Sequence, residues 1–282
     1  RYFMTNSRSE ILIDTHAHVA VGTLLSRTVA AIDRKMPILP VEDLNAQMDE
    51  HGVSHAVLVQ WGFSWDHHYL ARCLTDYPGR FAVIAHIDLS RDDACQVLDD
   101  MVRIHDFAGV RITTTARSPG NDPLAIWKKA HELDAVVSAS GRNVKDFADG
   151  LEPVLQELPN LRMRIEHLGR VPYGEAPPHL DFDRLLALAS YPGVHINIDG
   201  FLSHQYPDHF EYSTFPFAEY LLFVRQAVSA FGAERCMWGS EFPFLNNGYD
   251  AGVRFIREGC DFLDDVQREW ILGRSAKQFW RF

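Results

Sequence analysis

Two histidines, His16 and His18, stand two residues apart at the end of a short apolar run that begins at Ile11. Such a run is typical of a buried strand. The alternation of side chains along a strand places both imidazoles, with Asp14 behind them, on one face. Two imidazoles that converge on one point can bind a metal ion or polarise a carbonyl group. The spacing alone also fits two solvated histidines, so the motif needs support from elsewhere in the chain.

Further ionisable side chains stand where other apolar runs end. The third, fourth, sixth and eighth runs end in His86, Arg111, His167 and Glu241. An unpaired buried charge costs several kcal/mol, so ionisable residues at so many strand ends are not expected in a fold with a purely structural role. We therefore expect these side chains to share one site.

The elements that must position these residues are eight short apolar runs, too short for helices. They are residues 11–18, 55–60, 80–86, 109–112, 133–138, 161–167, 194–198 and 235–241. Segments with helical spacing alternate with them. One runs from Val41 and stops at Gly52, and Asp122-Pro123 predicts the start of a helix through Leu133. Residues 182–188 and 217–231 continue the alternation.

Strands that alternate with helices pair in parallel through right-handed crossovers, and eight such units close a barrel. The sequence therefore predicts an α/β fold, a single (β/α)₈ TIM barrel over residues 8–282 with extra C-terminal helices from Asp264 onward. We expect residues 1–7 to lie outside the fold, disordered or foreign to a natural chain that starts at Met4. Residues 22–40 and 201–216 are candidate lids over the carboxyl ends of the strands.

The composition argues against two classes of partner. The formal net charge is −11, and no cluster of lysine and arginine offsets it, so nucleic acid is not an expected partner. No apolar run approaches the roughly 20 residues of a membrane span, so we expect no membrane partner. The four scattered cysteines indicate reduced thiols and a cytoplasmic location. A homo-oligomer stays open, because Phe262 and Trp280 could pack on another subunit.

Three segments carry a resemblance to a known family. Residues 13–18, 165–170 and 238–243, with the sequences IDTHAH, IEHLGR and WGSEFP, resemble motifs of the amidohydrolase superfamily, in its amidohydrolase-related branch. Residues 271–276 fit the closing helix of that branch. The resemblance covers nearly the whole chain in order, which makes it more specific than any single motif.

Arginines narrow the resemblance within this branch. Arg111, Arg117 and Arg170 make the chain most similar to 2-pyrone-4,6-dicarboxylate hydrolase and related sugar lactonases. The resemblance implies hydrolysis of a small, carboxylate-bearing cyclic ester, with these arginines as anchors for the substrate carboxylates. His86 and His204 are further candidates for contact with this small anionic substrate, from the pocket floor and from the long seventh loop.

Glu241 is expected to act as the general base of this reaction. Between imidazoles it would stay ionised at neutral pH, accept a proton from water and direct that water at the ester carbonyl. His16, His18 and His167 would bind the carbonyl oxygen and stabilise the developing oxyanion, directly or through a bound cation.

The chain departs from the family pattern at two positions. Metal-dependent relatives place a histidine at the end of the fifth strand, where this chain has the poor ligands Ser138 and Ser140. The catalytic carboxylate of the eighth strand is normally Asp, and Glu241 extends its reach by one carbon–carbon bond of about 1.5 Å. A misplacement of about 1 Å can cost about a hundredfold in rate.

The cofactor prediction depends on counting ligands. His16, His18 and Glu241 could hold one divalent ion, with zinc the first choice, because catalytic zinc usually has three protein ligands and one open position. The missing fifth-strand histidine favours hydrolysis without a required cofactor. The sequence therefore predicts a lactonase. A metal-dependent decarboxylase or hydratase of the same branch and a non-catalytic binding protein are the alternatives.

Overall fold

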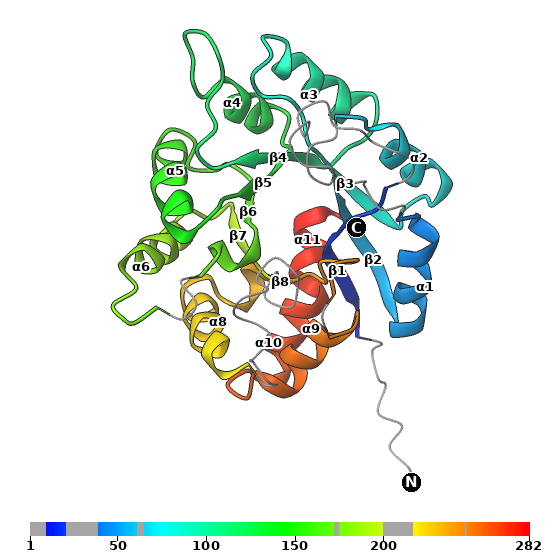
Figure 1. The fold of residues 1–282 in the computed structure, drawn as a ribbon, viewed down its shortest axis with the longest axis vertical. Coiled ribbons are helices and arrows are strands. Elements are labelled where there is room, and N and C mark those ends of the chain that lie inside the picture. The colour runs from blue at the N-terminus through cyan, green and yellow to red at the C-terminus, as the bar shows by residue number, and fades with distance from the viewer. Residues whose placement is uncertain (1–9, 21–38, 61–64, 172–174, 200–216, 246) are drawn as a thin grey trace.

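The structure is a computed structural model, and it describes residues 10–20, 39–60, 65–171, 175–199, 217–245 and 247–282. Eight parallel strands form one sheet in which each strand pairs with the next in sequence (Figure 1). The strands are β1 (Leu12–Ala17), β2 (Val53–Val59), β3 (Phe81–Ala85), β4 (Gly109–Thr113), β5 (Val136–Ser140), β6 (Met163–Ile165), β7 (Val194–Ile198) and β8 (Cys236–Trp238). The predicted (β/α)₈ barrel is confirmed.

Backbone bonds between the end of β1 and the segment after β8 close the barrel. Ala17 forms a parallel bridge with Phe242. The Glu241 N–H donates to the His16 carbonyl oxygen at 2.9 Å, and the His18 N–H donates to the Phe242 carbonyl oxygen at 2.8 Å. The closure therefore places Glu241 beside the two histidines of the first motif.

Helices follow the strands, and those before α11 lie around the outside of the barrel (Figure 1). They are α1 (Val41–His51), α2 (His68–Asp76), α3 (Ala94–Arg103), α4 (Ala125–Glu132), α5 (Val144–Glu157), α6 (Leu180–Ala187), α8 (Ala218–Phe231), α9 (Ala251–Arg254), α10 (Asp265–Glu269) and α11 (Ser275–Trp280), with π-helical turns at Phe255–Gly259 and Trp270–Arg274. The predicted stop of α1 is confirmed, since Gly52 caps it with a left-handed φ of 71°. None of the described helices is long and apolar enough to cross a membrane.

Two predicted boundaries are wrong, both around α4. Asp122 does not cap that helix, because its carboxylate accepts the Leu124 N–H within a preceding turn and the helix begins at Ala125. The fifth strand begins at Val136 instead of Leu133, because Leu133 caps α4 and Asp134 takes a left-handed φ of 53°. Local turn geometry therefore sets both boundaries at positions that the apolar pattern does not predict.

The apolar core has two parts. The larger cluster lies between the strands and the surrounding helices. The smaller one fills the barrel, where Ile13, Val57 and Met237 pack with Phe279 and Trp280 of α11. The C-terminal helix α11 therefore covers the amino-terminal end of the barrel, and the carboxyl ends of the strands stay available for a site. The candidate lids, residues 22–40 and 201–216, lie almost wholly outside the described residues, as do residues 1–7 and His204.

Candidate active site

The structure brings the predicted histidines and acid together at the carboxyl end of the barrel. His16, His18, His167 and Glu241 are all buried there, with exposed fractions of 0–2%. Glu241 Oε1 lies 3.1 Å from His16 Nε2 and 3.3 Å from His167 Nδ1. His16 Nε2 lies 3.2 Å from His18 Nε2. Segments far apart in the sequence therefore deliver one carboxylate and three imidazoles to one cluster.

Glu241 is not the fully ionised carboxylate expected from the sequence. Burial raises its pKa to about 7, although the nearby His167 favours the charged form. Its backbone also takes a left-handed φ of 65°, a conformation that costs energy for a residue with a side chain. His167 shares this feature, with a φ of 54°. The two strained residues present their side chains to each other from the loops after β8 and β6.

The β1 histidines are held on both sides of their rings. Arg164 Nη2 lies 3.2 Å from His16 Nδ1, and the Val59 carbonyl oxygen lies 2.7 Å from His18 Nδ1. Burial and the nearby cationic Arg164 lower the pKa of His16 well below its usual value. Burial, assisted by Arg111, lowers the pKa of His18 to about 3. Both rings are therefore neutral at physiological pH.

A carboxylate missed in the sequence, Asp199, orients His167. It directly follows β7, and its Oδ1 accepts the His167 N–H at 2.7 Å and lies 3.0 Å from His167 Nδ1. Asn197 donates to Asp199 Oδ2 at 2.6 Å and holds the carboxylate in place. His167 Nε2 is buried without a hydrogen-bond partner among the described residues. A bound substrate could supply that partner.

A second buried network lies beside the first and contains Glu166, which the sequence reading also missed. Arg111 donates to Glu166 Oε2 from Nη2 at 2.6 Å and from Nε at 3.1 Å. Ser138 donates to Glu166 Oε1 at 2.5 Å and accepts from Arg164 Nε at 2.8 Å. Burial would raise the pKa of Glu166, but Arg111, His167 and Arg164 together lower it to about 2. This network is charged and held together by ion pairs.

Asp14 does not join the histidines, contrary to the prediction from strand alternation. The pairing of β1 with β2 shifts register between Asp14 and Ala17, which breaks the alternation. The Asp14 carboxylate accepts hydrogen bonds from the Ser240 N–H and hydroxyl, at 2.8 and 2.6 Å, from Tyr249 at 3.0 Å and from the backbone N–H of His16, not its ring, at 3.1 Å. Burial raises its pKa to about 6. Asp14 thus anchors the loop after β8.

The remaining substrate-binding candidates have other contacts. Arg117 donates to the carbonyl oxygens of Thr114 and Gly150, at 3.0 and 3.1 Å, and so ties the loop after β4 to α5. Arg170 Nε donates to the Gly141 carbonyl oxygen at 2.9 Å, just beyond β5. The His86 ring stacks against Trp65 with 4.9 Å between centroids. Arg111, in contrast, is joined to the buried cluster through Glu166.

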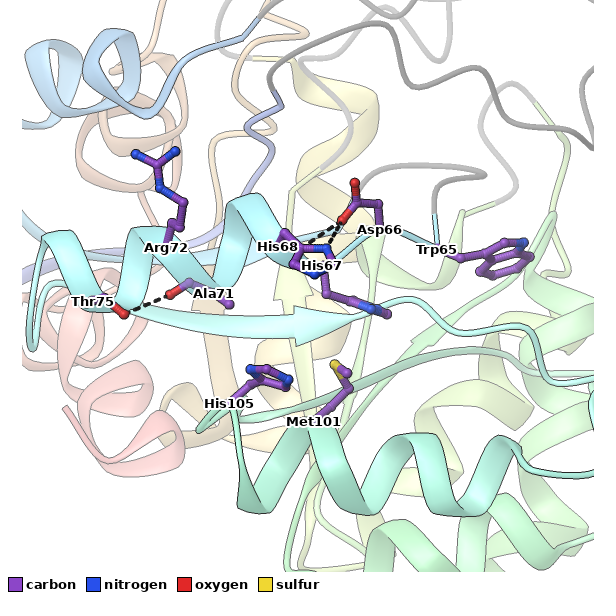
Figure 2. Close-up of a pocket in the computed structure, with 9 residues that line it drawn as sticks. All are labelled: Trp65, Asp66, His67, His68, Ala71, Arg72, Thr75, Met101 and His105. Atoms are coloured by element: carbon purple, nitrogen blue, oxygen red, sulfur yellow. Dashed lines mark hydrogen bonds and ion pairs between the residues drawn. The ribbon is translucent and has the colours of Figure 1, made fainter.

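A hollow of about 640 Å³ beside α2 contains none of these cluster residues (Figure 2). His67, which directly precedes α2, and Met101 of α3 face it, and His68 pairs with Asp66 at its edge. His67 Nε2 lies 3.2 Å from the His86 carbonyl oxygen, and burial lowers the pKa of His67 to about 4. These histidines form a separate feature of the molecule's surface.

One group of side chains in the described residues is close enough to hold a metal ion. It comprises His16, His167, Asp199 and Glu241, whose ligand atoms lie within 4.8 Å of one another. The predicted set shares His16 and Glu241 with this group but has His18 where the structure has His167 and Asp199. The donor types fit a divalent ion such as zinc. The hydrogen bond from Arg164 to His16 Nδ1 does not fit a metal ion. A neutral histidine that binds metal through Nε2 carries its proton on Nδ1, and Arg164 already donates to that nitrogen.

Comparison with known proteins agrees with this geometry. Residues 13–282 match the amidohydrolase family. The chain belongs to this family. An L-fucono-1,5-lactonase of Burkholderia ambifaria is 26% identical over 259 residues, which cover 85% of this amidohydrolase and 84% of the relative. Membership identifies the chain as a hydrolase.

Solved structures show the same fold at low sequence identity. A proposed 2-pyrone-4,6-dicarboxylic acid hydrolase from Pseudomonas putida has a TM-score of 0.76 and 23% identity, covering 96% of this chain and 98% of that one. A zinc-bound amidohydrolase from Burkholderia multivorans (TM-score 0.68, 17% identity) and a 2,6-dihydroxybenzoate decarboxylase from Rhizobium (TM-score 0.67, 16% identity) each cover 96% of this chain and are themselves 99% covered. These identities establish the fold alone.

The amidohydrolase site depends on a glycine at the end of β8. A Cβ atom on Gly239 would lie 2.8 Å from His16 Cβ and 3.0 Å from Asp199 Oδ2. We expect Gly239→Ala to push β1 and β7 apart and to lower kcat/KM by about a hundredfold, the cost of a shift of about 1 Å. Kinetic assay together with a urea unfolding curve checks this. A fully active Gly239→Ala enzyme contradicts the expectation.

Proposed function

We propose that this amidohydrolase hydrolyses a small, carboxylate-bearing lactone, with Glu241 as the general base. One observation carries the proposal: a fully buried carboxylate with a pKa of about 7 lies 3.1 Å from His16 and 3.3 Å from His167. A general base works best when its pKa is close to the working pH. The relative named as a lactonase supports the choice of a cyclic ester.

The proposed reaction has two proton transfers, both through Glu241. Its carboxylate takes a proton from water while the water oxygen attacks the ester carbonyl carbon. The bond between that carbon and the ring oxygen then breaks, and the protonated Glu241 returns the proton to the leaving alkoxide. The product is an open-chain hydroxy acid, so the sum is addition of one water molecule.

The other residues bind and polarise the substrate. His167 Nε2 is buried without a hydrogen-bond partner among the described residues, 3.7 Å from Glu166 Oε2, and when it carries a proton it would donate to a substrate carbonyl oxygen. Asp199 holds the ring in orientation through Nδ1. The Arg111 side chain is 15% exposed while its partner Glu166 is fully buried, so Arg111 is the member of that network that a substrate carboxylate can reach. His18 completes the wall of the site.

A panel of lactones tests the proposal directly. Sugar 1,5-lactones, aromatic-derived pyrone carboxylates and neutral lactones are assayed by pH indicator, each with and without a chelator. We expect turnover of at least one lactone, a preference for those with a carboxylate, and no loss with chelator. Absence of turnover across the whole panel contradicts the proposed function.

The pH dependence gives a second check. Because the active form of Glu241 is the carboxylate and its pKa is about 7, kcat/KM should rise about tenfold per pH unit below pH 7 and level off above it. After subtraction of spontaneous hydrolysis, Glu241→Gln should show no such rise in any residual activity. A wild-type profile that falls as pH rises through 7 would assign Glu241 the role of an acid instead.

A metal-dependent decarboxylase or hydratase is the second candidate, favoured by the group of His16, His167, Asp199 and Glu241. A bound divalent ion would supply Lewis-acid polarisation of the substrate. Elemental analysis of purified protein separates the two candidates. One equivalent of tightly held metal, with loss of activity in chelator, supports the second.

A further inference from the structure

We propose that Arg164 fixes the proton of His16 on Nε2, so that this imidazole donates to His18 beside Glu241 and does not ligate a divalent metal. Arg164 lies on β6 below the site and is fully buried. Its Nε donates to the Ser138 hydroxyl at 2.8 Å, its Nη1 to the Thr15 carbonyl oxygen and its Nη2 to His16 Nδ1 at 3.2 Å. Its guanidinium carbon lies 5.3 Å from the centre of the Trp280 ring.

The first step concerns His16 Nδ1. A guanidinium has only donors, and it does not lose its proton in proteins. The contact of 3.2 Å therefore requires His16 Nδ1 to accept the hydrogen bond with its lone pair. In a neutral imidazole one nitrogen carries the proton and the other accepts, so the proton of His16 lies on Nε2.

His18 leads independently to the same assignment. Its Nδ1 lies 2.7 Å from the Val59 carbonyl oxygen, which can only accept, so Nδ1 carries the proton of that ring. His18 Nε2 is then a lone pair. It lies 3.2 Å from His16 Nε2, and a hydrogen bond between the two nitrogens needs one proton, which His16 must supply. The chain of donors runs from Arg164 through His16 and His18 to Val59.

Asp199 is the competing acceptor near His16 Nδ1. Its Oδ2 lies 3.5 Å from that nitrogen and would favour a proton there. This contact is longer than the one from Arg164, and the same oxygen already accepts from Asn197 at 2.6 Å. The other carboxylate oxygen serves His167. Both carboxylate oxygens of Asp199 therefore have hydrogen-bond donors without a proton on His16 Nδ1.

The consequence is a positioning role for Arg164 with two effects. His16 Nε2–H donates to His18 Nε2 and lies 3.1 Å from Glu241 Oε1, so that its dipole favours the carboxylate form of Glu241. A metal on Nε2 would require the proton to move to Nδ1, where it would face the N–H groups of Arg164. The buried guanidinium therefore supplies the positive charge that an ion would supply, and it opposes an ion at this ligand. This inference deepens the metal-independent part of the proposed function and rests on it for its role in the reaction.

Nuclear magnetic resonance of the ¹⁵N-labelled wild-type protein tests the proton's position without any assay of activity. Long-range ¹H–¹⁵N correlations distinguish a protonated ring nitrogen from a lone pair, and the His16→Gln variant assigns the signals. We expect His16 to show a protonated Nε2 and an unprotonated Nδ1, and His18 the reverse. A protonated Nδ1 on His16 overturns the proposal.

Zinc binding to metal-depleted protein provides the second arm. Partners of a ligating histidine alter metal affinity by about 10- to 100-fold. We expect Arg164→Met to bind zinc more tightly than wild type by a factor in that range, measured by equilibrium dialysis and elemental analysis. Arg162→Met is the matched control, since Arg162 precedes the same strand and bonds to Asp134 and Phe279, away from the site. Equal affinity in wild type and Arg164→Met overturns the metal-excluding role.

The two arms separate this inference from the proposed function. Should Arg164→Met not fold, Arg164→Lys keeps the charge but loses the forked contacts, and the wild-type spectrum still decides the proton's position. A failed lactone panel with the expected His16 pattern removes the lactonase proposal alone. A working lactonase with a proton on His16 Nδ1 removes the role of Arg164 alone.

Discussion

Replacing Glu241 by Gln lowers kcat for lactone hydrolysis by about 10²- to 10⁴-fold and leaves substrate binding nearly unchanged. The amide keeps the size of the side chain but cannot take a proton from water, and general base catalysis contributes a rate factor of that size. Binding changes little because the partners that face the substrate, Arg111 and His167, remain in place. Steady-state kinetics and calorimetric titration with a slow substrate or the product measure the two quantities.

The fold of this variant is expected to persist. Burial already disfavours the charged form of Glu241, so a neutral amide of the same size is tolerated there. Glu50→Gln, an exposed position on α1, controls for loss of one negative charge and should retain full activity. If Glu241→Gln loses binding and turnover by the same factor, Glu241 contributes to substrate binding and not to the chemical step.

Much of the fold could be predicted because the sequence repeats one simple signal. Eight apolar runs alternate with amphipathic segments, and each run falls at a strand of the barrel. The carboxyl ends of parallel strands converge, so the positions of His16, His167 and Glu241 at the ends of apolar runs also predicted that they would meet. Their contacts of 3.1 and 3.3 Å confirm that these three side chains lie together.

The partners of these residues could not be read in the same way. Asp199 directly follows β7, so its position at a strand end could have predicted it as a member of the site. Arg164 lies on β6 and Glu166 directly follows it, and their charges are stabilised by Arg111 of β4 and Ser138 of β5, among other partners. Such pairing is a tertiary property. The spacing of residues along a strand predicts which face a side chain lies on, but not which charged residue of another strand will pair with it.

Asp14, by contrast, was predicted to lie beside the histidine side chains, and the structure places its carboxylate elsewhere. Perfect alternation predicts Asp14 on the face of His16, and the register shift between Asp14 and Ala17 removes it from that face. The carboxylate then bonds to Ser240 and Tyr249, which lie far along the chain. A bulge of this kind depends on the closure of the barrel, because the segment after β8 pairs with the end of β1.

Glu166→Gln is expected to lower the free energy of unfolding by about 3–5 kcal/mol at pH 7. Glu166 is fully buried, and it neutralises Arg111 at 2.6 Å and lies 3.7 Å from Arg164. Removal of one partner from a buried ion pair leaves an uncompensated charge, and that change typically has this cost. Urea unfolding followed by circular dichroism measures it. Glu157→Gln, on an exposed face of α5, should stay within about 0.5 kcal/mol of wild type.

The pH dependence of the free energy of unfolding tests whether loss of the ion pair causes the destabilisation of Glu166→Gln. The pKa of Glu166 is lowered to about 2 in the folded protein, so its contribution is complete above its usual pKa near 4.5 and is lost as pH falls towards 2. The difference between wild type and Glu166→Gln should therefore shrink over that interval. Asp14 and Glu241 have raised pKa values and act in the opposite sense, as pH rises. Asp14 is common to the two proteins, and Glu241, whose pKa Glu166 helps to raise, has a pKa of about 7, above the interval compared. A difference that stays constant from pH 7 to the acid limit would assign the loss to packing, and the buried charge of Arg111 would then be neutralised by other groups.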